Sequence, residues 1–96
     1  MMSVLVALSM ASALAWQSAA EREIRTEKPV VEAQFTGLNS LWVSVRDDGS
    51  KRDGFADYIC LVVKDSGMPA GATVVIRIKD RANLKNDLGR SVCSKP

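Results

Sequence analysis

Two short segments near the middle of the chain alternate between apolar and polar residues. Residues 30–36 (VVEAQFT) have an apolar side chain at every second position, and residues 41–46 (LWVSVR) repeat the alternation after the turn-forming sequence GLNS. A period of two places successive side chains on opposite faces of a β-strand. Because only four residues connect the two segments, they are expected to form a β-hairpin.

The pattern then changes to a helical period. From Lys51 to Ser66 the apolar residues recur at spacings of three and four, which places on one helix face the residues Phe55, Ile59, Val62 and Val63. Ser50 is expected to cap the start of this helix, and Gly67 follows its end as the usual terminator. The sequence therefore predicts one helix that packs on the sheet through this face.

A third strand is predicted over residues 73–79 (TVVIRIK), which alternate again. A strand that follows a helix in this way is expected to lie parallel to residues 41–46. Residues 80–89 are polar and are predicted to be irregular, whereas residues 90–94 (RSVCS) could return as a short antiparallel strand. The predicted fold class is α+β: a small mixed sheet in the order ββαβ, with or without a fourth, C-terminal strand, and one helix on one face.

The first twenty residues carry no charged side chain, and all 13 basic and 11 acidic residues follow them. An apolar run that ends in small residues is typical of a secretory signal peptide. Small residues at the −3 and −1 positions would allow cleavage after Ala15 or after Ala20. The segment has no Lys or Arg at its start, which is unusual for a signal peptide, so an uncleaved membrane anchor and an ordinary buried helix remain alternatives.

The rest of the chain is expected to form a charged arm and one domain. Residues 21–29 (EREIRTEKP) alternate acidic and basic side chains around one isoleucine, which indicates a solvated arm. Residues 30–96 then form a single small α+β domain, since 96 residues leave room for only one. The chain is expected to be exported, to the periplasm or the medium, with residues 1–20 removed. A membrane would be a partner only if that segment stayed uncleaved.

Composition and charge exclude several functions. A net charge of +2, spread along the chain, does not predict a nucleic-acid partner, which usually meets a concentrated basic face. The chain contains no histidine, so neither a Ser-His-Asp nor a Cys-His mechanism can be assembled. A structural zinc site usually needs four Cys or His ligands, and only two cysteines are present. We therefore expect no enzyme, no cofactor and no metal.

Cys60 and Cys93 are the two cysteines of the chain. In a small exported domain the simplest explanation of two cysteines is a disulfide bond between them. A reduced cysteine in the core is one alternative, which would require that the chain is not exported. A catalytic thiol is another, but it would lack a histidine base and a C-x-x-C partner.

The strand face that points away from the predicted helix is a candidate binding surface. It is expected to gather one aromatic and three basic side chains: Trp42, Arg46, Arg77 and Lys79. This combination could contact an extracytoplasmic protein, a glycan or an anionic ligand. The alternative is a tryptophan half covered by the charged arm, with ordinary solvated bases around it.

Lys51 and Arg52 form a candidate anion site. Both are expected in the first turn of the helix, where the helix dipole disfavours cations and attracts anions. A bound anion would reconcile the two cations with that position. The alternative is that their side chains extend into water or pair with Asp47 and Asp48.

Overall fold

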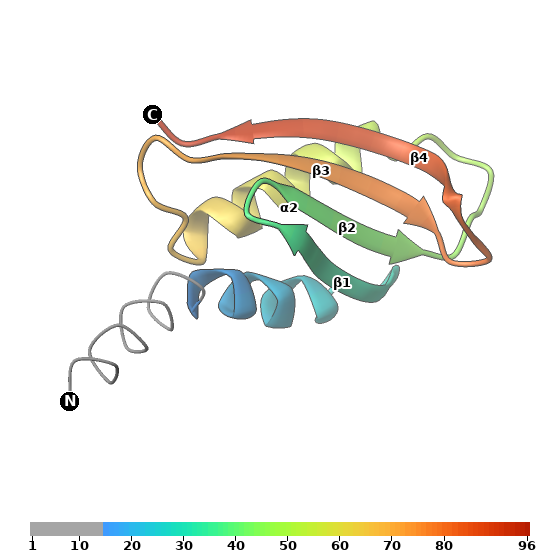
Figure 1. The fold of residues 1–96 in the computed structure, drawn as a ribbon. Coiled ribbons are helices and arrows are strands. Elements are labelled where there is room, and N and C mark those ends of the chain that lie inside the picture. The colour runs from blue at the N-terminus through green and yellow to red at the C-terminus, as the bar shows by residue number, and fades with distance from the viewer. Residues whose placement is uncertain (1–14) are drawn as a thin grey trace.

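A computed structural model describes residues 15–96. Four strands form one sheet in the order of the chain: β1 (Val30–Gly37), β2 (Ser40–Val45), β3 (Thr73–Asp80) and β4 (Asn83–Ser94). The helix α2 (Asp53–Asp65) connects β2 to β3, and a second helix over residues 15–25 precedes β1 (Figure 1). The α+β class, the mixed sheet and the fourth strand are thereby confirmed.

The pairing of the strands agrees with the pattern of the sequence. β1 and β2 form an antiparallel hairpin, and β3 and β4 form a second one. β2 and β3, which α2 connects, lie parallel to one another in the middle of the sheet. A connection that contains a helix is long enough to bring the chain back to the same end of the sheet, as a parallel pair requires.

The core lies between the sheet and the two helices. On the two central strands it consists of alternate, fully buried residues: Leu41, Val43, Val45, Val74, Ile76 and Ile78. From the other side α2 contributes Ala56, Ile59, Cys60 and Val63. Burying a side chain such as Ile76 contributes about 1.5–3 kcal/mol relative to leaving it in water. In Figure 1, α2 lies behind the strands, so the opposite face of the sheet is turned toward the viewer.

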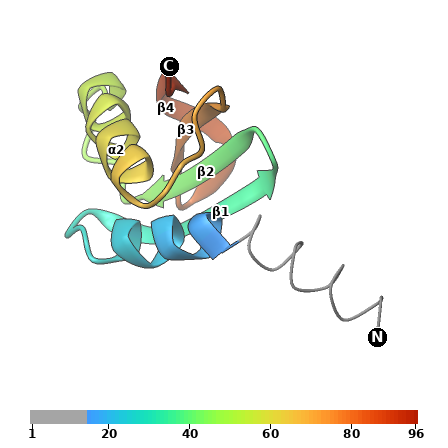
Figure 2. The same ribbon diagram turned by 90° about the vertical axis from the view of Figure 1, so that its left-hand side faces the viewer.

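The largest difference from the sequence prediction is the helix over residues 15–25. A solvated arm was expected from residue 21, but Ile24 within it is fully buried. Ala20, the residue before the expected arm, is also fully buried. Trp16, Ala20 and Ile24 follow one another at a spacing of four, which is a helical stripe. The stripe crosses residue 20, the expected boundary between the signal segment and the charged arm. Neither segment taken alone therefore shows the helical period. Figure 2 shows this helix next to α2.

The predicted signal segment falls largely outside the described residues. Residues 1–14 belong to it and are not described. Its remaining residues, 15–20, belong to the helix over residues 15–25, and Ala20 packs on the core.

The second difference lies in residues 80–89, which were predicted to be irregular. β4 begins at Asn83, which pairs with Asp80 at the end of β3, and the pairing continues back along β3 to Thr73, opposite Ser94. The first five residues of β4 are all exposed, so they show no apolar alternation that would mark a strand. Gly89 lies so close to Arg52 that a Cβ atom built on it would be 2.2 Å from the Arg52 carbonyl carbon. The end of the loop before α2 therefore lies directly against β4.

The start of α2 also differs from the prediction. The helix begins at Asp53, and its N-cap residue is Arg52, with no side-chain cap. Ser50, the predicted cap, instead donates its hydroxyl to the Asp48 carboxylate. The predicted end is confirmed, since α2 stops at Asp65 and Gly67 follows with a φ of 102°.

Candidate functional site

Cys60 and Cys93 form a disulfide bond, as the sequence predicted. Cys60 lies on the buried face of α2 and Cys93 on the inner face of β4, with their Cα atoms 5.4 Å apart. Since 33 positions separate them, the bond is expected to stabilise the fold by about 3–4 kcal/mol through loop closure. Neither a free core cysteine nor a catalytic thiol describes this pair. The bond ties the helix to the last strand and is part of the core.

The face of the sheet opposite the helices, here called the open face, carries three rows of side chains across the strands. The central row contains one residue from each strand, directly opposite the next: Gln34, Trp42, Arg77 and Arg90. A second row contains Ser40, Val75 and Val92. A third contains Glu32, Ser44, Lys79 and Asp87. Strand pairing thus brings together residues that are as far apart as 56 positions in the sequence.

Arg77 and Arg90 are the most unusual neighbours in the central row. They lie directly opposite one another on the antiparallel strands β3 and β4. Like charges in this position are destabilising. Among residues 15–96, no carboxylate lies within ion-pair distance of either guanidinium. The chain therefore holds two cations side by side on the open face without a described acidic partner.

Lys79 plays a different role from the one the sequence suggested. Its side chain is buried, its ammonium group forms an ion pair with Asp87, and it lies 4.4 Å from the centre of the Trp42 ring. Pairing with Asp87 offsets the cost of burying this charge. Together with Leu84, Trp42 and Lys79 line a shallow pocket of about 120 Å³. The Lys79 ammonium group thus packs against the face of the Trp42 ring and offers little charge to solvent.

The structure brings together three of the four residues predicted for this face. Trp42 and Arg77 are direct neighbours, and Lys79 lies beneath Trp42. Arg46 follows the end of β2 and borders a separate hollow at the end of the sheet, near Asp80. Arg90 belongs to the central row with Trp42 and Arg77. It was not predicted for this face because the register of β4 against β3 cannot be read from the sequence. The pocket that Trp42 lines is formed by residues of the four strands, and none of residues 15–29 lines it; the helix over residues 15–25 lies along β1 (Figure 1).

The candidate anion site at Lys51 and Arg52 has a different geometry from the expected one. Both residues precede the helix, which begins at Asp53. The Arg52 guanidinium lies 3.3 Å from the Asp48 carboxylate and donates to the Arg46 carbonyl. Hydrogen bonds from the Ser50 hydroxyl and amide, with Arg52 nearby, hold the pKa of Asp48 below its usual value. Arg52 thus pairs within the loop, whereas Lys51 is exposed.

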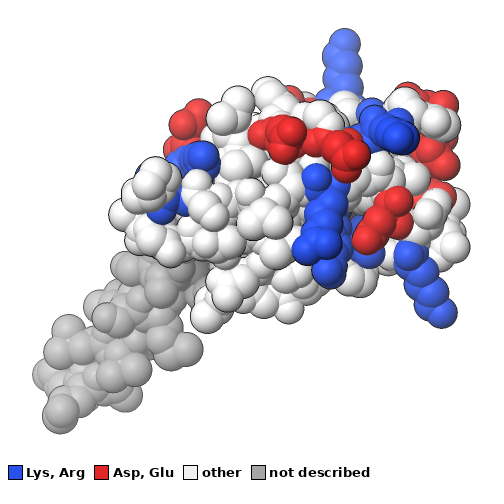
Figure 3. Space-filling view, turned by 90° about the horizontal axis from the view of Figure 1, so that it is seen from above, with Lys and Arg blue, Asp and Glu red and all other residues white. Residues whose placement is uncertain are grey.

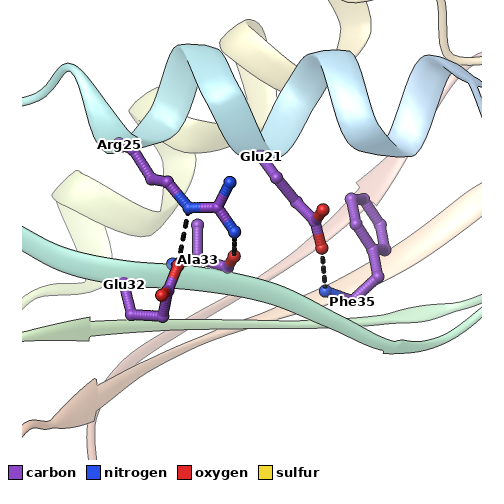
Figure 4. Close-up of polar contacts among 5 residues, drawn as sticks. All are labelled: Glu21, Arg25, Glu32, Ala33 and Phe35. Carbon is purple, nitrogen blue, oxygen red and sulfur yellow. Dashed lines mark hydrogen bonds and ion pairs between the residues drawn. The ribbon is translucent and has the colours of Figure 1, made fainter.

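The outer edge of β1 is occupied by side chains from the N-terminal helix (Figure 4). The Phe35 amide donates to the Glu21 carboxylate at 2.8 Å, and Arg25 donates to the Ala33 carbonyl at 2.9 Å. Arg25 also forms an ion pair with Glu32 at 2.6 Å. The Ala33 amide, and after it Arg25, lowers the pKa of Glu32 through hydrogen bonding. Because these partners satisfy the backbone groups of an edge strand, β1 is protected against pairing with another strand here.

The distribution of charge is mixed. On the face that Figure 3 shows, Lys and Arg side chains alternate with Asp and Glu, with uncharged surface between them. This surface has no continuous basic region of the kind that binds nucleic acid.

No family model, curated protein sequence or solved structure matches this chain. Within residues 15–96, no helix is both long and apolar enough to cross a membrane. In the same part of the chain, His, Cys, Asp and Glu side chains do not gather in a set of three that could hold a metal ion.

Proposed function

We propose that this chain is an exported, non-enzymatic domain that binds an extracytoplasmic partner through the open face of its sheet. Export is supported by the charge-free N-terminal segment and by the Cys60–Cys93 disulfide, which suits an oxidising compartment. The disulfide also suits a small domain, whose core alone gives limited stability.

The observation that carries the binding proposal is the central row of the open face. One face of the sheet holds the core and both helices, whereas the other carries a half-buried Trp42 beside the Arg77–Arg90 pair. Tryptophan and arginine are the residue types enriched where proteins bind one another most strongly. A partner that neutralises the arginines would relieve their repulsion and gain affinity from it.

Export is tested by expressing the full-length chain in a bacterial host and separating the extracytoplasmic fraction from the cytoplasm and membranes. Thiols are labelled at lysis with an alkylating reagent. The proposal expects the chain outside the cytoplasm with both cysteines protected from the reagent. A cytoplasmic chain with two labelled cysteines would refute export.

Binding is tested by immobilising the folded chain and exposing it to extracytoplasmic extract from its source. Arg77→Glu changes the charge of the central row, and Arg22→Glu makes the same change on the N-terminal helix, away from the open face. The proposal expects a protein that the native chain and Arg22→Glu retain but Arg77→Glu does not. Equal retention by all three would show that binding does not use the open face.

A further inference from the structure

We infer that the open face recognises an extended protein segment in which an acidic side chain binds between Arg77 and Arg90 and an apolar side chain contacts Val75 and Val92. This inference rests on the proposed function and specifies its ligand.

The geometry of the arginine pair points to one carboxylate. Residues directly opposite one another on antiparallel strands have Cβ atoms about 4.5–5.5 Å apart, so the two guanidinium groups can reach the same anion. Guanidinium matches the planar geometry of a carboxylate and can donate two hydrogen bonds to it. Asp53, the nearby acid, accepts instead from the Arg90 backbone amide at 2.9 Å. It therefore caps the edge of β4.

The neighbouring row supplies the apolar half of the site. Val75 and Val92 lie opposite one another on β3 and β4, and 60% of Val92 is exposed. This row is two residues from the arginine row along each strand, which corresponds to about 6.6–6.8 Å. The same distance separates side chains at positions i and i+2 of an extended peptide. An acidic and an apolar residue with one residue between them therefore match both rows.

The charges around the arginines favour a protein segment over a continuous polyanion. The third row lies next to the arginine row, on the side away from the valines. Its two ends are Glu32 on β1 and Asp87 on β4. A nucleic acid or sulfated polysaccharide that crossed this face would approach these carboxylates and compete with them for their ion-pair partners, Arg25 and Lys79. A single carboxylate next to an apolar group avoids them, and it also uses the exposed surface of Val92.

The inference is tested by nuclear magnetic resonance with the full chain and an acetylated, amidated heptapeptide TLTETLT. Its control is TLTQTLT, which has the same shape and no charge. We expect saturable shifts of the Arg77 and Arg90 Nε–Hε signals and of the Val75 and Val92 methyl signals with the acidic peptide only. Arg90→Gln should weaken this binding about tenfold, the loss expected for one charge-assisted contact, whereas Arg22→Gln should leave it unchanged.

Three outcomes would overturn the inference: equal binding of both peptides, tighter binding of hexametaphosphate than of TLTETLT, and a dimer of the chain that buries the arginines. If a partner is still lost from Arg77→Glu while the acidic peptide fails to bind, the proposed function survives and only the ligand class is wrong.

A second inference comes from the N-terminal helix and is independent of the open face. Trp16 packs edge-to-face on Phe35 with ring centres 5.4 Å apart, and the Gln17 side chain donates to the Leu38 carbonyl at 3.4 Å. Ala20 is fully buried in the core. Cleavage after Ala20 would remove all three residues, and the five helical residues left behind are too few to hold a helix without tertiary support.

We therefore infer that, once the chain is exported, cleavage occurs after Ala15 and the mature protein begins at Trp16. This inference rests on the proposed export. Peptide mapping of the exported full-length chain tests it. An N-terminal peptide that begins at Trp16 supports it, and one that begins at Glu21 overturns it while leaving export intact. A chain that retains Met1 would contradict cleavage itself.

Discussion

The Glu21 carboxylate accepts a hydrogen bond from the Phe35 amide at 2.8 Å, across a sequence separation of 14 residues. A side chain of the N-terminal helix thus replaces the missing neighbour strand at the edge of β1 (Figure 4). The same helix inserts Ala20 and Ile24 into the core. Residues 15–25 consequently pack on the sheet as part of the fold.

Replacing Glu21 tests this role of the helix. Glu21→Ala leaves the Phe35 amide without its partner and should lower the free energy of unfolding by about 1 kcal/mol. Glu21→Gln keeps an acceptor oxygen and should cost less. Hydrogen exchange of the Phe35 amide is the direct measurement: it should accelerate in the alanine variant. An unchanged exchange rate in Glu21→Ala would show that the contact does not protect the edge.

Glu32 should give the domain a component of stability that depends on pH. Its folded pKa is lowered by the Ala33 amide and Arg25, so the ionised form is favoured in the folded state. A carboxyl group with a lowered folded pKa makes its whole contribution to the free energy of unfolding at pH values above its unfolded pKa. That contribution is lost as the pH falls through the folded pKa. The free energies of unfolding of the native chain and Glu32→Gln should therefore differ at neutral pH and converge as the pH falls below the folded pKa of Glu32. A constant difference would contradict this assignment.

Gly89 is needed because of the close contact between β4 and the start of α2. Gly89→Ala would place a Cβ atom 2.2 Å from the Arg52 carbonyl carbon, and the resulting shift should cost about 1–3 kcal/mol. Gly54 offers a control, since no atom lies within 4 Å of a Cβ at that position. Gly54→Ala should stabilise the domain slightly through its higher helix propensity. Equal effects of the two substitutions in urea denaturation would contradict the contact.

The disulfide should account for a large share of the stability. The double variant Cys60→Ala with Cys93→Ala removes the link between α2 and β4 and should lower the free energy of unfolding by about 3–4 kcal/mol. Guanidinium denaturation of the native chain with and without reductant provides the comparison. If reduction leaves the midpoint unchanged, the bond does not hold the helix to the strand as described.

The sequence predicted the parts of the fold in which one segment carries its own periodic pattern. β1, β2, β3 and α2 were found because each shows a period of two or of about 3.6 within itself. The N-terminal helix was missed because its buried stripe of Trp16, Ala20 and Ile24 spans the boundary between an apolar segment and a charged one. The first half of β4 was missed because its exposed residues, from Asn83 to Asp87, carry no apolar alternation.

The candidate site was predicted only in part, for a related reason. Alternation along β2 and β3 is enough to assign Trp42 and Arg77 to one face. It cannot say that Arg90 lies opposite Arg77, because that depends on the length of the turn after β3 and on the register of β4. Nor can it show that Lys79 is buried beneath Trp42 and paired with Asp87. Such contacts arise only when the sheet is assembled.

The central claim is that the Arg77–Arg90 pair serves a ligand and does not stabilise the fold. The most direct test is the free energy of unfolding of Arg90→Glu, measured without any partner at low salt. Replacing like charges by opposite ones should stabilise the free domain by about 0.2–1 kcal/mol, while binding of TLTETLT is lost. If Arg90→Glu destabilises the free domain instead, the arginine pair is a structural feature and the account of the open face is wrong.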